Sequence, residues 1–287
     1  MLLELKDVRK CFPGKRRLFH PIREDVRAVD DVSLQVREGE NLGLVGESGC
    51  GKTTLARLIL KLTPMDSGAI IFEGRDISSL GQNKMRPIRR NLQMVFQDPY
   101  SSLDPRFTVR GILQEAQDIL RQDSSKGKEA QRVELLKAVG LEEDALNRFP
   151  HEFSGGERQR IAIARALVFN PRLLILDEAV SSLDVLVQQQ IIDLLGDLQK
   201  RFHTTYLFIS HNLRIARKIS SRVAVMFKGK IVETAPTEEL FRHPVHPYTR
   251  ALLSAAMDYQ VASANDDMTL ERGLSLVEKG PGHFVYC

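Results

Sequence analysis

The sequence predicts an α/β fold in which a parallel sheet carries a phosphate-binding loop at the carboxyl end of a strand. Three stretches lead to this prediction. A glycine-rich loop at 46–54 joins a short apolar segment, 41–45, to a run of apolar residues with helical spacing. Residues 173–176 are consecutively apolar, as expected of a strand covered on both faces of a parallel sheet. Residues 206–209 form a further short strand, which ends in polar side chains.

Composition bounds the possible functions. The chain has 287 residues, 43% of them hydrophobic, which is enough to bury a core in one large or two small domains. Its net charge of +4 is compatible with a membrane surface or with nucleic acid and selects neither. The three cysteines are scattered, so they indicate no disulfide framework or zinc site, and a reducing compartment fits best. The sequence starts without a signal-peptide layout and has no apolar run of roughly 18 residues, so any membrane role would depend on a partner.

The first two predicted strands, 2–8 and 28–36, flank a basic loop that contains Phe12 and Phe19. An aromatic ring just before a phosphate site could stack on a nucleobase. The spacing equally allows the ring to cover the edge of a sheet.

The loop at 46–54 fits the pattern G-x-x-x-x-G-K-[ST] without a mismatch. Its glycines allow backbone NH groups to surround a phosphate at a helix N-terminus, Lys52 supplies a cation, and the Thr53 hydroxyl can ligate magnesium. The glycine spacing does not follow the G-x-G-x-x-G of dinucleotide-binding loops, so the loop predicts a nucleoside triphosphate. The matched residues are Gly46, Glu47, Ser48, Gly49, Cys50, Gly51, Lys52, Thr53 and Thr54. The apolar residues at helical spacing after the loop are Leu55, Leu58, Ile59 and Leu62.

Two more strands are predicted at 69–72 and 92–96, and a helical insertion follows them over about 100–170. Within the insertion, Ser154 and Glu157 form a capping box at the start of a helix. The two glycines between them weaken that helix, and the capping box alone does not explain them. A helix start with bare backbone is a second candidate anion site.

Two carboxylates, Asp177 and Glu178, follow the apolar strand 173–176. Ligands of open α/β sheets bind at the carboxyl ends of the strands, so Asp177 could hold magnesium through water and Glu178 could orient or deprotonate an attacking water. An acidic strand end without function is the alternative. His211 lies just past the strand 206–209 on the same predicted edge, although a lone histidine is more often structural.

The last predicted elements are a hairpin, 222–227 with 231–234, and a stiff turn at 243–250. The core is expected to end near Leu240. The polar remainder is expected to be an extended tail.

Taken in order, these motifs resemble the ATPase subunits of ATP-binding cassette (ABC) transporters. The resemblance covers almost the whole chain. It implies a P-loop NTPase (RecA-like) α/β core with an antiparallel β subdomain, an α-helical subdomain and a short C-terminal extension. It divides the chain into a nucleotide-binding domain at 1–242, with the helical subdomain at about 98–165, and an extension at 243–287. The matching residues are the loop at 46–54, Gln97, the signature at 154–159, Asp177 with Glu178, Ser182 to Asp184, and His211.

The family implies two such subunits packed head to tail, with ATP between the phosphate loop of one and the signature of the other. Phe12 would stack on adenine, with Phe19 as the alternative. Gln97 would contact magnesium and water and link the helical insertion to a membrane partner. Asp184 would communicate across the dimer, and His211 would hold the outer phosphate and the water. The implied magnesium contacts are Thr53, Gln97 and Asp177, and the implied signature residues are Ser154, Gly155, Gly156 and Glu157.

The run at 95–105, the turn at 243–249 and Ala179 resemble the ATPases of oligopeptide, dipeptide and nickel importers. This resemblance implies two membrane-spanning permease subunits, a second ATPase subunit and an extracytoplasmic binding protein, with the chain peripheral on the cytoplasmic face of the inner membrane. A heterodimer is expected, and a homodimer stays open, as does the substrate. An exporter ATPase and a soluble ATPase acting on nucleic acid or ribosomes are the alternatives. The chain has one cassette and shows no long coiled-coil insertion, so no nucleic-acid partner is expected.

Many relatives in this branch carry a cysteine cluster for iron and sulfur in the C-terminal tail. This tail has only Cys287, so the chain itself cannot supply four cysteine ligands. We predict no iron–sulfur cluster and only ATP and Mg²⁺ as cofactors.

Overall fold

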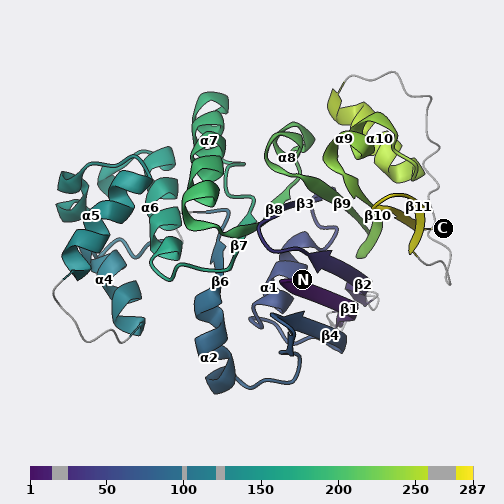
Figure 1. Ribbon diagram of the computed structural model, residues 1–287, viewed down its shortest axis with the longest axis horizontal. Helices are drawn as coiled ribbons and strands as arrows, with labels where there is room; N and C mark the ends of the chain where they lie inside the picture. Colours follow the sequence, from purple (N-terminus) through teal and green to yellow (C-terminus); the bar gives the residue numbers. More distant parts are fainter. Residues whose placement is uncertain (15–24, 99–101, 121–126, 258–275, 287) are drawn as a thin grey trace, which may run out of the picture. The chain divides into compact units, whose positions relative to one another are not determined.

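The computed structural model describes residues 1–14, 25–98, 102–120, 127–257 and 276–286 (Figure 1). The chain divides into two compact units. The first contains Met1–Met85 and Leu207–Cys287, and the second contains Arg86–Tyr206. Phe19, the stretch 99–101 and Cys287 lie outside the described residues.

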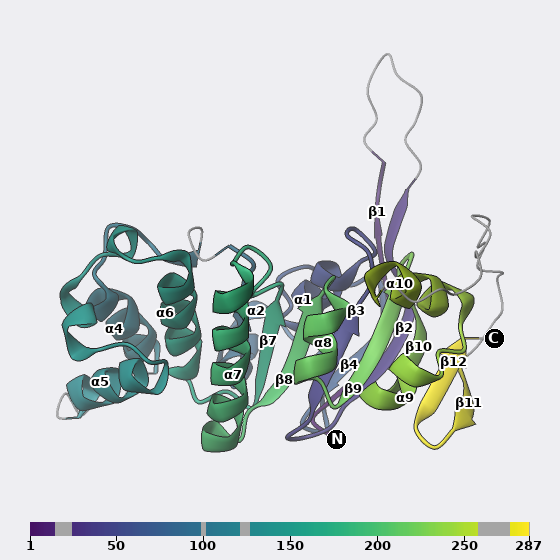
Figure 2. The same ribbon diagram turned by 90° about the horizontal axis from the view of Figure 1, so that it is seen from above.

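The first unit contains an antiparallel sheet of strand order β2-β1-β4-β5. Its strands are β1 (Leu3–Phe12), β2 (Val26–Val36), β4 (Ser67–Phe72) and β5 (Arg75–Asp76). Leu3 pairs with Val36 on one side and with Phe72 on the other, and β1 and β2 run side by side in Figure 2. The expected strands at 2–8, 28–36 and 69–72 and the antiparallel β subdomain are therefore confirmed.

The second sheet of this unit combines parallel and antiparallel pairs. The strand β3 (Asn41–Val45) pairs in parallel with β9 (Arg222–Phe227), which forms an antiparallel hairpin with β10 (Lys230–Pro236). The helix that follows the phosphate loop is α1 (Lys52–Ile59). It ends before Leu62, which is 54% exposed rather than part of the buried stripe, because Lys61 turns into the left-handed region with a φ of 52°. The remaining helices are α8 (Leu213–Ile219), α9 (Thr237–Arg242) and α10 (Pro247–Met257).

The C-terminal segment corrects the expected end of the core. The strands β11 (Leu276–Gly280) and β12 (His283–Tyr286) form a hairpin, and β12 pairs antiparallel with β10. Tyr248, Leu253 and Val285 are 3%, 6% and 2% exposed, so the core extends well past Leu240. The prediction of an extended tail is therefore wrong for 276–286, because short strands that pair with a distant edge leave little local signal.

The second unit holds the predicted helical insertion. The strand β6 (Leu92–Val95) pairs in parallel with β7 (Leu173–Asp177), and every residue of β7 is buried. The helices of this part of the chain are α2 (Gln82–Asn91, which begins in the first unit), α4 (Val109–Ile119), α5 (Lys128–Ala138), α6 (Gly155–Leu167) and α7 (Val185–Phe202), with 3-10 turns at Glu143–Asn147 and Pro150–Glu152. The strand β8 (Thr205–Ser210) crosses the unit boundary. Across the described residues, every helix is too short or too polar to span a membrane.

Candidate functional site

The phosphate loop connects β3 to α1, and its conformation requires glycine at three positions. Gly46 has a φ of 152°, and a Cβ there would lie 2.1 Å from the Met226 carbonyl oxygen. Gly51 is the N-cap of α1 with a φ of 116°, and a Cβ there would lie 2.0 Å from the Ala28 carbonyl oxygen. Gly49 has a φ of 83°, which L side chains rarely adopt. Backbone of β2 and β9 therefore approaches the loop closely enough to exclude side chains.

Lys52 is held inside this loop. It is 5% exposed, and its Nζ donates to the carbonyl oxygens of Gly46 at 2.7 Å and Glu47 at 2.8 Å. The thiol of Cys50 is 3.7 Å from the same nitrogen and is a weak acceptor. Burial raises the pKa of that thiol, which keeps it neutral. The geometry suits a Lys52 ammonium that can exchange its weakest contact, the one with the Cys50 sulfur, for a phosphate oxygen.

The rim of the loop is open. Glu47, Ser48 and Gly49 are exposed, while Thr53 and Thr54 are half-buried in the first turn of α1. Two hydrogen bonds join the loop to residues far along the chain. The Cys50 carbonyl accepts from Gly229 N at 2.9 Å, and the Tyr248 hydroxyl accepts from Glu47 N at 3.2 Å. The sequence did not indicate that Tyr248 contacts the phosphate loop. It indicated only that this residue lies in the turn at 243–250.

Phe12 and His211 also belong to the first unit. Phe12 ends β1, is 40% exposed, and has the Lys10 ammonium 5.4 Å from its ring centroid. His211 is exposed and directly follows β8, as expected. The next residue, Asn212, caps α8 by accepting from Arg214 N and Ile215 N.

The signature segment opens α6 in the second unit. The Ser154 hydroxyl accepts from Glu157 N at 3.3 Å, and a Glu157 carboxylate oxygen accepts from Ser154 N and Oγ, both at 2.8 Å. The predicted capping box is confirmed. The donation from Ser154 holds the pKa of Glu157 below its usual value.

The glycines of the signature also have a packing role. A Cβ on Gly156 would lie 2.5 Å from Cγ1 of Val187, and one on Gly155 would lie 3.4 Å from Cδ2 of Leu183. The segment just before and inside α7 therefore rests against the start of α6. This contact, in addition to any anion, favours glycine at position 156, because a Cβ there would displace the Val187 side chain.

The two carboxylates lie at the carboxyl end of β7. Asp177 is the last residue of the strand and is 4% exposed. Glu178 follows with a φ of 48°, and its carbonyl accepts from the Ser181 backbone N–H and hydroxyl. Val95 of β6 pairs with Leu176, so Gln97, two residues further on, belongs to the same strand edge.

Asp184 caps α7 by accepting from Val187 N at 3.0 Å. Its carboxylate therefore has a local structural role. The predicted site residues are divided between the units. The first unit holds the phosphate loop, Phe12 and His211, and the second holds Gln97, the signature, both strand-end carboxylates and Asp184.

Comparison with known families decides the identity. The profile of the ABC transporter family matches residues 29–181, which include the phosphate loop, the signature and both carboxylates. The chain belongs to the ABC transporter family. This ABC ATPase also matches, at residues 232–281, the family described as the C-terminal region of oligopeptide/dipeptide transporters. The recognised family and the P-loop NTPase fold are thus confirmed, and the chain is an ATP-hydrolysing enzyme.

Similar proteins cover nearly the whole ABC ATPase. It is 51% identical to the oligopeptide transport ATP-binding protein AppF of Bacillus subtilis. The alignment covers 88% of this chain and 78% of AppF. It is 45% identical to OppF, another oligopeptide transport ATP-binding protein of Bacillus subtilis. That alignment covers 100% of this chain and 96% of OppF. The glutathione import ATP-binding protein GsiA of Salmonella typhimurium is 44% identical, and the chain spans 48% of it.

Solved structures agree on the fold. A dimeric ATP-binding cassette in a post-hydrolysis state, bound to ADP and phosphate, matches 82% of the chain and 99% of its own length, with a TM-score of 0.70 and 27% identity. The protein cbiO1 of Clostridium perfringens matches 90% of the chain and 96% of its own length with a TM-score of 0.72. At 22% identity, the second likeness concerns the fold alone.

Proposed function

We propose that this ABC ATPase powers the uptake of peptides through a membrane complex. The observation that carries the proposal is the C-terminal region at 232–281, which matches the family described for oligopeptide/dipeptide transporters. Two relatives at 51% and 45% identity are oligopeptide transport ATP-binding proteins, which favours peptides over nickel.

ATP would bind between the phosphate loop of one subunit and the signature of a second. The Lys52 ammonium, which donates to the Gly46 and Glu47 carbonyls, would bridge the loop and the outer phosphates. Phe12, exposed at the end of β1, would stack on adenine. At the second subunit, the N-terminus of α6 offers backbone N–H groups and a positive dipole end to the same phosphates.

The donor set fits Mg²⁺. Thr53, Gln97 and Asp177 offer a hydroxyl, an amide oxygen and a carboxylate, which are the hard oxygen ligands that this ion prefers. A bound ion would neutralise charge on the phosphate oxygens.

Hydrolysis would depend on Glu178 and His211. Glu178 follows the last residue of β7, at the strand edge where ligands of α/β sheets bind. We assign its carboxylate the role of general base toward water. His211 would donate to the outer phosphate from the turn after β8, and Asp184 would carry the effect across the dimer.

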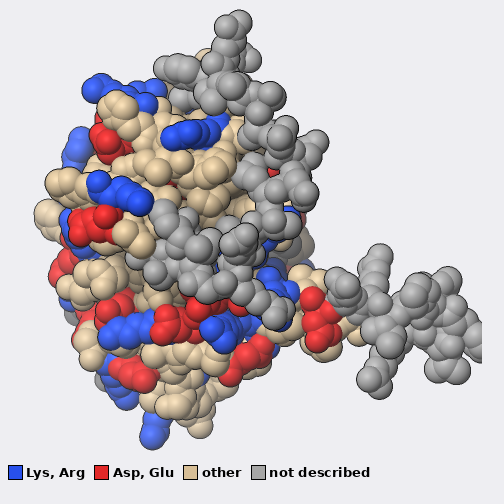
Figure 3. Space-filling view, turned by 90° about the vertical axis from the view of Figure 1, so that its right-hand side faces the viewer, with Lys and Arg blue, Asp and Glu red and all other residues tan. Residues whose placement is uncertain are grey.

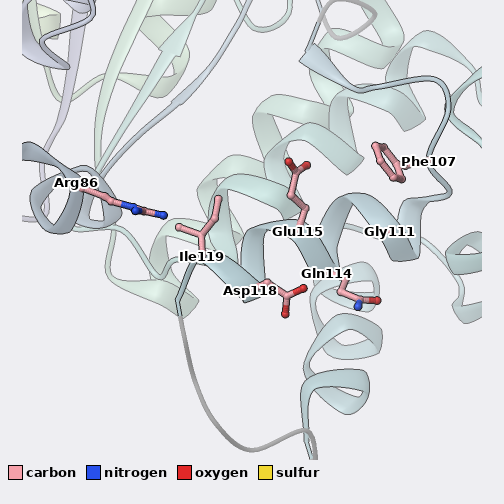
Figure 4. Close-up of a pocket in the computed structure, with 7 residues that line it drawn as sticks. All are labelled: Arg86, Phe107, Gly111, Gln114, Glu115, Asp118 and Ile119. Atoms are coloured by element: carbon pink, nitrogen blue, oxygen red, sulfur yellow. The ribbon is translucent and has the colours of Figure 1, made fainter. Parts of the chain in front are cut away.

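The assembly would contain two permease subunits, a second ATPase subunit and an extracytoplasmic binding protein, with this chain on the cytoplasmic face of the inner membrane. We place a permease contact in a cavity of about 540 Å³ on the second unit (Figure 4). It is lined by Arg86, Phe107, Gly111, Gln114, Glu115, Asp118 and Ile119. Phe107 and Ile119 are 48% and 39% exposed, and exposed apolar side chains beside charged ones are typical of interaction sites.

A nucleic-acid partner is not favoured. On the face shown in Figure 3, Lys and Arg side chains are interleaved with Asp and Glu. Nucleic-acid binding usually depends on a continuous basic patch.

The test is a pull-down of the tagged chain from solubilised native membranes, followed by an ATPase assay of the complex. We expect two permeases and a sister ATPase, and hydrolysis that rises with peptide-loaded binding protein. Phe107→Ala should weaken the recovery of permeases, whereas Phe149→Ala, at a ring 37% exposed outside the cavity, should not. Recovery of the chain alone or with ribosomes would reject the transport assignment.

A further inference from the structure

The phosphate loop is held by contacts from segments far along the chain. Gly46 packs against the Met226 carbonyl, and Gly229 N donates to the Cys50 carbonyl at 2.9 Å. The third support is a side chain. The Tyr248 hydroxyl accepts from Glu47 N at 3.2 Å, across 201 residues of sequence.

With a second hydrogen bond, this contact holds both peptide units that meet at Glu47. The N–H of Glu47 is bound to Tyr248, while its carbonyl accepts from Lys52 Nζ at 2.8 Å. The position of the Glu47 backbone therefore helps to set the position of the ammonium. A change at Tyr248 reaches the phosphate-binding cation through this single residue.

The Tyr248 ring is itself rigidly seated. It is 3% exposed and stacks on Phe227 with 4.0 Å between ring centroids. Its backbone N–H donates to Nδ1 of His246 at 3.1 Å. Burial raises the pKa of the Tyr248 hydroxyl, and the Glu47 carboxylate raises it further, so the group is neutral at physiological pH.

A buried carboxylate anchors the turn that carries Tyr248. Glu233 of β10 is 0% exposed and accepts from Val245 N at 2.8 Å and from His246 N at 3.0 Å. The ring of His283, on β12, lies 2.7 Å from the same carboxylate. The terminal hairpin, the turn at 243–250 and the phosphate loop thus form one continuous chain of contacts within the first unit.

We propose that Tyr248 is a positioning residue for ATP binding, through which the C-terminal region preorganises the phosphate loop. A loop that is already held in its binding conformation loses less freedom when the nucleotide binds. The inference goes beyond the transport role, because it concerns nucleotide affinity and not the transported substrate.

Tyr248→Phe is the decisive variant, since it keeps the ring and its stacking and deletes only the hydroxyl. Tyr206→Phe is the matched control. Tyr206 is 1% exposed, and its hydroxyl donates at 3.0 Å to the Leu195 carbonyl in the second unit. Both changes remove one buried hydroxyl that makes a hydrogen bond to backbone.

We expect the Kd for ATP of the purified full-length chain to rise about 3- to 10-fold in Tyr248→Phe and less than about twofold in Tyr206→Phe. In steady-state assays KM should rise while kcat stays unchanged. Without nucleotide, hydrogen exchange at the Glu47 amide should be faster in Tyr248→Phe alone. Titration of the unaltered chain with ATP tests whether the ATP site exists. The ratio of the Kd of the variant to that of the unaltered chain tests the role of Tyr248.

Two results would overturn the proposal. One is an unchanged Kd and unchanged Glu47 exchange in Tyr248→Phe. The other is an equal rise in Kd for both variants that follows their loss of thermal stability, because the hydroxyl would then be merely structural.

Discussion

At position 156, packing against α7 is one reason for glycine. The sequence suggested bare backbone for an anion, and the structure adds that the Val187 side chain occupies the space of a Cβ, 2.5 Å away. Gly46 and Gly51 of the phosphate loop are constrained in the same way by backbone carbonyl oxygens. Such contacts follow from the approach of distant segments, so no local pattern could reveal them.

We therefore expect Gly156→Ala to lower the free energy of unfolding by about 1–3 kcal/mol through overpacking. Gly196→Ala, inside α7, is the matched control. Within the described part of the chain, apart from the neighbouring backbone of α7 itself, nothing lies within 4 Å of a Cβ built there, so the change should stabilise the helix by about 0.5–1 kcal/mol. Urea denaturation measures both.

Adding Val187→Ala to Gly156→Ala should recover part of the loss, because it removes the clashing methyl group. A double variant no more stable than Gly156→Ala alone would contradict the packing explanation.

At the scale of the element, the start of α6 combines a reciprocal cap with a titratable group. The Glu157 carboxylate accepts from Ser154 N and Oγ, and this lowers its pKa from the usual 4.5. The capping box was predictable from the sequence, because the cap and its partner are only three residues apart.

The cap should make stability depend on pH. Because the folded pKa of Glu157 is lowered, its stabilising contribution is complete above about 4.5 and is lost as the pH falls through the folded value. Glu157→Gln keeps an acceptor for Ser154 N and does not titrate. The difference in urea midpoint between the unaltered chain and this variant should therefore shrink between neutral pH and pH of about 3. A difference that does not change with pH would show that this carboxylate is not the titrating group.

At the scale of the whole molecule, ATP hydrolysis is expected to control how two copies of the cassette associate. Glu178→Gln preserves the size of the side chain and removes the proton acceptor. Hydrolysis should fall by about 100-fold or more while ATP binding persists, and an ATP-bound dimer should accumulate. An ATPase assay and sedimentation with ATP measure the two effects.

Glu143→Gln, at an exposed position in a 3-10 turn of the second unit, is the control and should behave as the unaltered chain. Normal hydrolysis by Glu178→Gln would mean that Glu178 is not the catalytic carboxylate.

The sequence by itself determined the features that depend on neighbours along the chain. The phosphate loop between strand and helix, the buried strand predicted at 173–176 and the capping box of α6 all rest on residues close in sequence, whose backbone preferences act locally. Together with Gln97, the strand-end carboxylates, Ser182 to Asp184 and His211, these features carried the resemblance to the family, which the match over residues 29–181 confirms.

Only the tertiary structure decided where the C-terminal segment goes. The pairing of β12 with β10, the burial of Glu233 beside His283 and the contact of Tyr248 with Glu47 join residues 50 or more positions apart. A short strand and a single hydroxyl have no periodic pattern in the sequence. Their partners are the sheet edges and backbone groups that still lack a hydrogen bond when the rest of the chain has folded. The segment 276–286, expected as part of an extended tail, instead forms a hairpin whose second strand pairs with β10 and buries Val285.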